Sequence, residues 1–559
     1  MTSPMPRPRT VVHQATRFLP GRDDYAQLPR TWRTDVFAGI TVGIVALPLA
    51  LAFGVASGVG AAAGLVTAVI AGLVAAVMGG SHVQVSGPTG AMVVVLAPIV
   101  AAHGVGSIAL LSLMAGVIVV LLGISRLGRA VAFIPWPVVE GFTLGIGTII
   151  FLQQVPLATG TDGTPGENTA VAAWLSVAEA TWPTAGMTLA VVAGVVLMML
   201  LLPRIHRALP SSLIAVVAAT VAAELLRLDI PRIGALPSAL PTPAFPAITP
   251  ELLQDLAGPA FAVAALAAIE SLLSARVAAG MPGPGGATGP YNPDRELTGQ
   301  GLASIGAGLF GGMPATGAIA RTAVNVRSGG RTRLSSVVHA LVLLVVVYAA
   351  AQLVGQIPLA ALAGILMVTA TRMVSRHTVA SILKSSRADA MLFVSTAVIT
   401  VAFDLIEAIQ IGVLAAAFFA LRAMAKVSGV RREPLPGEPQ PGDERIALFR
   451  LEGSMFFGAA ERIMQEISAV RDVEVAILRL SHLRLLDATG ARTLVEIIGE
   501  LEGRGVTVLV KGIKPEHVKL TENVGVIKAL RHFKHRFDDL EQSVEHARDH
   551  VRRNAEARA

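Results

Sequence analysis

Apolar runs of membrane length recur along most of this chain, and they limit what it can fold into. The 559 residues are 53% hydrophobic and only 15% charged, whereas soluble domains carry about 25% charged residues. Because a bilayer-spanning helix needs about 20 consecutive apolar residues, the pattern predicts a polytopic α-helical membrane protein. We expect spans near 36–53, 58–79, 88–102, 107–123, 130–154, 184–202, 210–226, 258–278, 297–312, 315–326, 334–354, 358–371, 389–404 and 407–426.

Two of these segments are short, and the distribution of charge sets the topology of the rest. The segments that open at Gly87 and Pro314 are predicted to be half-spans. Lys and Arg gather in alternate loops if the N-terminus is cytoplasmic, while loop 155–183 is acidic and has no Lys or Arg. The positive-inside rule therefore predicts about 14 spans with both termini cytoplasmic. We expect the chain to lie in the plasma (inner) membrane. We expect an interfacial helix at 168–181, outside the bilayer.

The composition changes after Lys426. The linker at 431–442 is rich in Pro and Gly and is expected to be a semi-rigid spacer without a packed interface. Beyond it, IALFRLEG, VEVAILRL and VTVLVKGI read as strands, and ARTLVEIIGELEGRG reads as an amphipathic helix. We expect a cytoplasmic N-terminal segment at 1–35, a membrane domain at 36–430 and a small α/β domain at 443–555.

A carboxylate in the middle of one span is the strongest functional signal. Glu270 lies in GPAFAVAALAAIESLLSARVAAG, and an ionisable residue within a bilayer is usually functional. Arg321 follows a Gly/Pro break in GGMPATGAIARTAVNV, and VQVSGPTGAMVVV has the same Thr-Gly-Ala triplet. Two broken helices and one buried acid are typical of a secondary transporter.

These segments carry a family resemblance. SGPTGA, AAIESLLSARVA, the stretch 293–336 and the motif LRLLDATGARTL occur in the order found in the sulfate permease (SulP) family. The last motif is similar to a STAS domain, named for sulfate transporters and anti-sigma-factor antagonists. The resemblance implies two inverted seven-span repeats with half-helices 3 and 10, a mobile core moving against a gate, and a homodimer.

The two breaks predict an anion site. A helix N-terminus offers free N–H groups and a partial positive charge, and two such ends would meet here. Thr89 and Thr316 add hydroxyl groups, while Gly90 and Gly317 allow close approach to the backbone. The alternative is that these residues only kink packed helices. The expected substrate-binding set is Phe53 (by the resemblance), Thr89, Gly90, Ala91, Thr316, Gly317, Ala318 and Arg321.

Glu270 is expected to bind the coupling cation, together with Ser274. The alternative is a structural ion pair with Arg321, which itself either attracts the anion or only neutralises Glu270. Sodium-coupled relatives resemble this segment but have Asp followed four residues later by Thr, and a polar residue where Ile319 stands. That difference favours protons over sodium.

Other polar residues are weaker candidates. In Asp-Ala-Thr-Gly, Thr489 stands at the position that is phosphorylated in anti-sigma antagonists, and it is a possible regulatory site. The alternative is that the motif only caps a helix. Glu140 is expected to pair near the inner surface, His339 and Gln153 to be hydrogen-bonded packing residues, and Asp404 and Glu407 to lie at the outer interface.

Several function classes are excluded by the sequence. There is no cysteine and no P-loop, and no nucleophile–base pair or metal cluster is evident. The net charge of +7 comes from short loops, so it does not indicate nucleic acid. We predict no enzyme activity, cofactor or metal, and no signal peptide. The prediction is a secondary active transporter of a small inorganic anion, sulfate first and bicarbonate second, coupled to H+ and working by alternating access in the lipid bilayer. The alternatives are a sodium-coupled bicarbonate or dicarboxylate symporter, an uncoupled anion channel or exchanger, and a nucleobase transporter.

Overall fold

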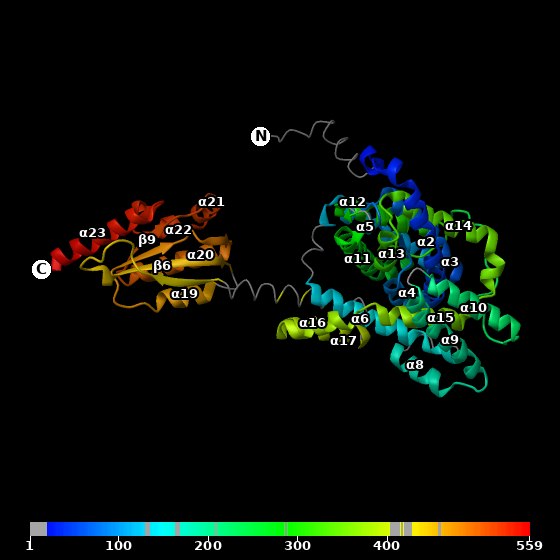
Figure 1. Cartoon of the computed structure of the whole chain (residues 1–559). Coiled ribbons are helices and arrows are strands. Elements are labelled where there is room, and N and C mark those ends of the chain that lie inside the picture. Colours follow the sequence, from blue (N-terminus) through cyan, green and yellow to red (C-terminus); the bar gives the residue numbers. More distant parts are fainter. Residues whose placement is uncertain are drawn as a thin grey trace. The chain divides into compact units, whose positions relative to one another are not determined.

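The chain forms two compact units, residues 1–413 and 414–559, and each is described by itself (Figure 1). The computed structural model describes residues 20–128, 135–161, 168–206, 209–283, 286–287, 289–402, 414, 418, 428–456 and 460–558. Apart from Leu414 and Phe418, the predicted span 407–426 lies outside the described residues, and so do Asp404 and Glu407.

The first unit is a bundle of apolar helices. Within the described residues, eight helical segments are long and apolar enough to cross a membrane. Their many small residues let neighbouring helices approach closely. The helices are α2 (Leu28–Ala56), α3 (Ala61–Met78), α4 (Gly90–His103), α5 (Ser107–Ile124), α6 (Trp136–Gln153), α7 (Val155–Thr159), α8 (Thr169–Ala178), α9 (Thr184–Ile205), α10 (Ser211–Leu225), α11 (Pro250–Gly280), α12 (Pro293–Leu309), α13 (Ile319–Arg327), α14 (Arg333–Gly355), α15 (Leu359–Arg372), α16 (Arg376–Ser385) and α17 (Arg387–Ala402).

The two predicted half-spans are short helices, each preceded by a short strand. Strand β1 (Ser86–Gly87) pairs antiparallel with β4 (Thr316–Gly317), and α4 and α13 follow them. The half-helices begin at Gly90 and Ile319, a few residues after the predicted openings at Gly87 and Pro314. A proline disfavours helical backbone in the residue before it, and the strand pair supplies hydrogen bonds that a helix would otherwise supply.

In this unit, helices from the N-terminal half of the sequence pack among helices from the C-terminal half, and the reverse also holds. Helix α14, from the second half, packs on α2 and α3, while α5, from the first half, packs on α11 and α12. Such reciprocal packing is what a twofold relation between the halves produces. A second group consists of α6, α9, α10, α15 and α17, which pack on one another and meet the first group through α2 and α4.

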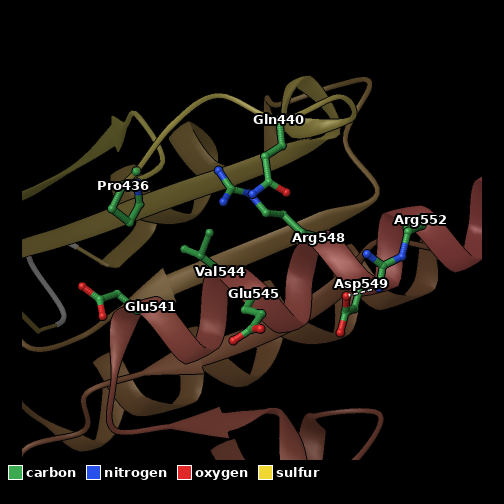
Figure 2. A pocket seen from close by; sticks show the side chains of 9 residues that line it. Pro436, Gln440, Glu541, Val544, Glu545, Arg548, Asp549 and Arg552 are labelled. Carbon is green, nitrogen blue, oxygen red and sulfur yellow. Dashed lines mark hydrogen bonds and ion pairs between the residues drawn. The ribbon is translucent and has the colours of Figure 1, made fainter.

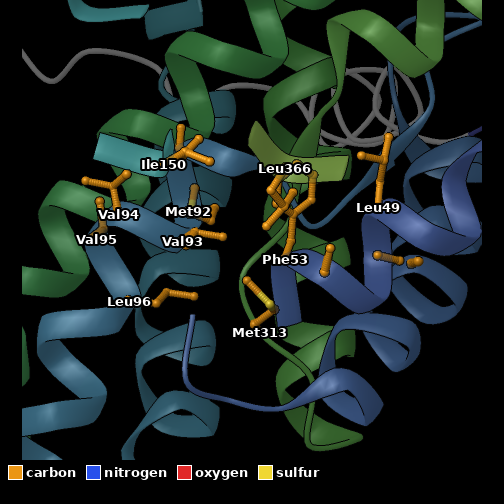
Figure 3. Packing of buried hydrophobic residues seen from close by; sticks show 14 of the residues in the cluster. Leu49, Phe53, Met92, Val93, Val94, Val95, Leu96, Ile150, Met313 and Leu366 are labelled. Carbon is orange, nitrogen blue, oxygen red and sulfur yellow. The ribbon is translucent and has the colours of Figure 1, made fainter. Parts of the chain in front are cut away.

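An apolar cluster lies where the two helix groups meet. Phe53 of α2, Ile150 of α6 and Leu366 of α15 belong to one buried cluster, together with Met313 just before β4. Figure 3 shows Phe53 beside Leu366 and Met313, with Ile150 above the start of α4. The chain therefore packs apolar side chains next to the paired strands.

Two connecting segments are helical. The helix predicted at 168–181 is confirmed as α8, which Asn168 caps through its side chain. The segment 376–385, expected to be a loop, is the amphipathic helix α16, capped by Ser375. Its charged residues suggested a loop, but they occupy one face of a helix whose Ile382 is fully buried.

The second unit is the predicted α/β domain. Its sheet has the order β10-β9-β7-β6-β5, with β8 also paired to β6. Helix α20 packs into one apolar cluster, and α23 contributes Val544, Ala547 and Val551 to another. The elements are β5 (Gly429–Glu433), β6 (Ile446–Met455), α19 (Ala460–Ser468), β7 (Val475–Arg479), β8 (Leu483–Leu486), α20 (Ala488–Gly503), β9 (Thr507–Lys511), α21 (Pro515–Val524), α22 (Val526–Ala529), β10 (Arg536–Phe537) and α23 (Leu540–Arg558).

The prediction that the linker lacks a packed interface is wrong. Its first residues belong to β5, which pairs antiparallel with β6, and Leu435 packs against the cluster under α23. Arg548 of α23 donates to the Asp443 carboxylate at 2.8 Å and to the Glu438 carbonyl at 3.2 Å. Figure 2 shows Arg548 reaching from α23 toward this segment, beside Gln440. Ion pairing and apolar burial thus hold the segment on the domain.

Candidate functional site

The site is built around Glu270 of α11. Its Oε2 accepts a hydrogen bond from Thr89 Oγ1 at 2.8 Å and another from Thr316 Oγ1 at 2.6 Å. Thr89 is the residue before α4 and Thr316 lies in β4, so the start of each half-helix supplies one hydroxyl. The two hydroxyl oxygens are 3.1 Å apart. The pairing of β1 with β4 therefore brings three polar groups from distant parts of the sequence to one point.

Arg321 does not pair with Glu270. Its Nη2 donates to the carbonyl of Pro88, and among the described residues no ion pair joins it to Glu270. The side chain is only 2% exposed and its Nη1 has no partner. A Cβ on Gly87 would lie 2.7 Å from Nη1, so glycine makes room for the guanidinium. A close-contact Glu270–Arg321 ion pair is therefore absent from the described residues, and the guanidinium lies beside Gly87 of β1.

The starts of both half-helices keep free N–H groups. The first turn of any helix lacks intrahelical acceptors for its N–H groups. Neither α4 nor α13 has a side-chain cap, and no backbone acceptor within the described residues takes the N–H groups of 90–92 or 319–321. These amides and the two helix dipoles favour negative charge near Thr89 and Thr316.

The resemblance led us to expect Phe53 at the anion site, and the structure places Phe53 beside Gly90 at the start of α4. A Cβ on Gly90 would lie 3.4 Å from Phe53 Cε1 and would overlap Ile150 Cδ1. Ala91, the next residue, is fully buried. The apolar side chains of α2 and α6 thus cover the start of α4.

Gly317 does not offer its backbone to a ligand. Its N–H donates to Ser271 Oγ at 3.0 Å, and a Cβ on Gly317 would overlap the carboxamide of Gln84. The next amide, that of Ala318, donates to the carbonyl of Val85 at 2.9 Å. The structure therefore does not leave the expected room for an anion at Gly317, because Gln84 fills the adjacent space and protein groups accept from the Gly317 and Ala318 amides.

Ser274 is buried one turn beyond Glu270 and bonds elsewhere. Its hydroxyl donates to Thr322 Oγ1 at 3.4 Å, and Thr322 Oγ1 accepts from the N–H of Val85 at 3.0 Å. The structure therefore does not bring Glu270 and Ser274 together in one hydrogen-bonded set. Among the described residues there is no group of three or more His, Cys, Asp or Glu that could hold a metal ion.

The weaker candidates have structural surroundings. Glu140 accepts from Trp136 Nε1 at 2.9 Å, one turn away on α6. His339 is fully buried, and among the described residues its ring nitrogens and Oε1 of Gln153 have no close hydrogen-bond partner. The expected hydrogen bonds are therefore not found at these atoms, and Gly72, which faces the His339 ring, has no side chain to supply one.

Thr489 lies in the first turn of α20 and is exposed. The preceding Asp487 caps the helix by accepting from the N–H of Gly490 at 2.7 Å. The motif is thus a helix cap, and it also leaves the Thr489 side chain at the surface.

Three supporting residues escaped sequence reasoning. Ser271 follows Glu270 and holds the Gly317 amide, while Gln300 and Ser304 of α12 bond to Ser86 and Ala315. The available signal was weak. Gln300 and Ser304 stand four residues apart, on one face of a helix that is otherwise mostly small and apolar.

Together, the two half-helices joined through the paired strands β1 and β4, the acid Glu270 bonded to both connections and the separate α/β domain define a class of helical membrane protein. The description "Sulfate permease family" matches residues 32–396, and "STAS domain" matches residues 440–543. The chain belongs to the sulfate permease family and ends in a STAS domain.

Relatives and solved structures agree with this assignment. The chain is 33% identical over 523 residues, covering 91% of this chain and 97% of the other, to "Putative sulfate transporter YvdB" of Bacillus subtilis. It is 32% identical over 522 residues, covering 89% and 91%, to "Bicarbonate transporter BicA" of Synechocystis.

Two structural likenesses bear on the fold. The transmembrane domain of a cyanobacterial BicA matches with a TM-score of 0.61 and 35% identity, over 68% of this chain and 97% of that one. SLC26A9 matches with a TM-score of 0.85 over 99% of this chain and 96% of that one. At 17% identity, the second likeness shows the fold alone: a helical membrane protein with a C-terminal STAS domain.

Proposed function

We propose that this chain is a secondary active transporter of a small inorganic anion, sulfate or bicarbonate, coupled to protons through Glu270. Relatives named for each anion support this substrate class. One observation carries the proposal: hydroxyls from the starts of two half-helices both donate to a single carboxylate.

That contact supplies a means of coupling. A hydroxyl has one proton to donate, so while Glu270 is ionised the hydroxyls of Thr89 and Thr316 are committed to it. A protonated Glu270 becomes a donor itself and no longer needs both hydroxyls. They are then free to donate to an anion, so that proton and anion bind together.

The charge around this point suits an anion. The free N–H groups of 90–92 and 319–321 belong to two helix N-termini, each with about half a positive charge. Arg321 adds a full charge without an ion-pair partner among the described residues. Glu270 is partly exposed and Ile319 is 38% exposed, so the site borders accessible space.

Protons are favoured over sodium as the coupling ion. A hard cation takes several oxygen ligands at once. Here Ser274 bonds to Thr322 instead of facing Glu270 with its hydroxyl, and apolar Ile319 occupies the start of α13. A proton needs only the one carboxylate.

Alternating access would move the two helix groups against each other. The cluster around Phe53, Ile150 and Leu366 lies between them, and its apolar contacts could separate without leaving a polar group unpaired. We place the chain in the plasma (inner) membrane as a homodimer with both termini cytoplasmic, and Thr489 as a regulatory phosphorylation site. These proposals rest on the family resemblance, on the loop charges and on the exposure of Thr489.

The test is uptake by proteoliposomes that contain the full chain. Labelled sulfate, bicarbonate and fumarate are offered in turn, with an inward gradient of either protons or sodium. The proposal predicts accumulation of sulfate or bicarbonate with the proton gradient alone. Accumulation that requires sodium would favour the sodium-coupled symporter, and flux that never exceeds equilibrium would favour a channel or exchanger.

A further inference from the structure

Three polar residues lie along one face of helix α12. Glu296, Gln300 and Ser304 are spaced four residues apart, so they share one face of the helix. All three are at most 2% exposed. A buried polar side chain in a small-residue membrane helix calls for an explanation, because such groups are unfavourable unless they are bonded. We call these residues the polar stripe.

Glu296, the first residue of the stripe, holds the segment that leads from α3 to β1. Glu296 accepts from the N–H groups of Gly80 and Ser81, both at 2.8 Å, and from Gln300 Nε2 at 2.9 Å. Gly80 and Ser81 begin the segment that leads from α3 to strand β1. Glu296 therefore fixes both this segment and the side chain of Gln300.

The other two residues of the stripe bond to the two segments that carry Thr89 and Thr316. Gln300 Nε2 donates to Ser86 Oγ in β1. Ser304 Oγ accepts from the N–H of Ala315 at 3.2 Å and contacts its carbonyl at 3.4 Å, immediately before β4. One helix face thus touches both strands from which Thr89 and Thr316 extend.

Helix α12 is itself held rigidly. A Cβ on Gly299 would lie 2.5 Å from Gly79 Cα, and a Cβ on Gly301 would lie 2.5 Å from the carbonyl oxygen of Gly116. Backbone contacts this close fix α12 against α3 and α5. The position of the polar stripe is therefore set by α3 and α5, and does not depend on β1 or β4.

We propose that Gln300 and Ser304 are positioning residues of the transport site, and that the polar stripe sets the relative placement of β1 and β4. This inference rests on the proposed function, because the placement matters through the hydroxyls and N–H groups offered to the anion. Neither residue is placed in contact with the anion or with Glu270.

The test compares Q300L, S304A and S86A with the control T298V in the full chain. Thr298 lies on the same helix, and its one hydroxyl bond within the described part of the chain is to the carbonyl of Asp294, on its own helix, at 3.0 Å. Two measurements are made: hydrogen exchange of the amides in 83–92 and 315–322, and the KM and maximal rate of anion uptake.

We expect exchange in both segments to rise in Q300L and in S304A but not in T298V. The anion KM should rise about tenfold, the usual effect of losing one buried hydrogen bond, with a smaller change in maximal rate. Q300L combined with S86A should be no worse than Q300L alone, because both remove the same contact.

Two results would overturn the inference: unchanged exchange in both segments, or equal KM changes in Q300L and T298V. If Q300L does not fold, S86A and S304A decide the question by the same criteria. Exchange is measured without any substrate, so it tests the positioning even if the wild-type chain transports neither anion, a result that would refute the proposed function instead.

Discussion

Replacing Thr316 by Val tests the coupling contact most sharply. Valine keeps the shape of threonine and removes only the hydroxyl. Thr316 is fully buried and donates to Glu270 at 2.6 Å, so the variant leaves the Glu270 carboxylate with one protein donor fewer. If the hydroxyl passes from the carboxylate to the anion when Glu270 is protonated, the variant loses one donor to the bound anion.

The size of the effect follows from the type of bond. A hydrogen bond to a charged group contributes about 1.5–3 kcal/mol, which corresponds to an affinity loss of about 10- to 150-fold. Thr89 donates to the same carboxylate oxygen at 2.8 Å, and T89V should therefore act similarly. The double variant should lose less than the two single losses combined, because the two hydroxyls lie 3.1 Å apart and share one partner.

The assay is calorimetric anion binding to purified full chain at several pH values. The wild type should bind more tightly as the pH falls, because protonation of Glu270 releases the hydroxyls. T316V should bind more weakly and show a flatter pH dependence. The matched control is T188V, since Thr188 is buried in α9 and, among the residues that the structure describes, its hydroxyl bonds to its own helix alone, at Thr184 and Ala185. Wild-type affinity and wild-type pH dependence in both T316V and T89V would refute the reasoning.

Three further predictions follow from the structure. G317V should destabilise the membrane unit, because the new side chain would overlap Gln84; the measurement is the thermal midpoint in detergent, and a wild-type midpoint with weakened anion binding would contradict it. Deletion of 428–559, which removes all of β5 and the STAS domain, should leave a folded unit that still binds anion, and a folded unit with no affinity in calorimetry would contradict it. Burial lowers the pKa of His535 and His546 in the STAS domain; the unfolded chain therefore binds their protons more readily, and domain stability should fall as the pH drops below about 6.5. Melting at pH 7.5 and 5.5 checks this, and a double H535F/H546F variant that keeps the full pH dependence would contradict it.

The general site was predictable from the sequence because its chemistry is unusual in a membrane. Glu270 is conspicuous in an apolar span, and the repeated Thr-Gly-Ala triplet marked both half-helices. The helix periodicity and the change in composition after Lys426 likewise predicted the bundle and the α/β domain.

The local geometry was not predictable, for physical reasons. A strand of two residues, such as Thr316–Gly317, has no periodicity, and its partner lies more than 200 residues away. The role of Gly317 depends on Gln84, which only the fold brings near it. Composition also misled at the linker, where Leu435 and the Arg548–Asp443 pair hold a Pro-rich segment in place.

The most direct test of the account is accumulation by the variant E270Q. Glutamine keeps the size of the side chain and an oxygen that accepts from Thr89 and Thr316, but it cannot take up a proton. Proteoliposomes with wild-type chain and an inward proton gradient, without sodium, should concentrate the transported anion above equilibrium. E270Q should only exchange internal for external anion and should not respond to the gradient. If E270Q concentrates the anion as well as the wild type does, Glu270 is not the coupling site and the account is wrong.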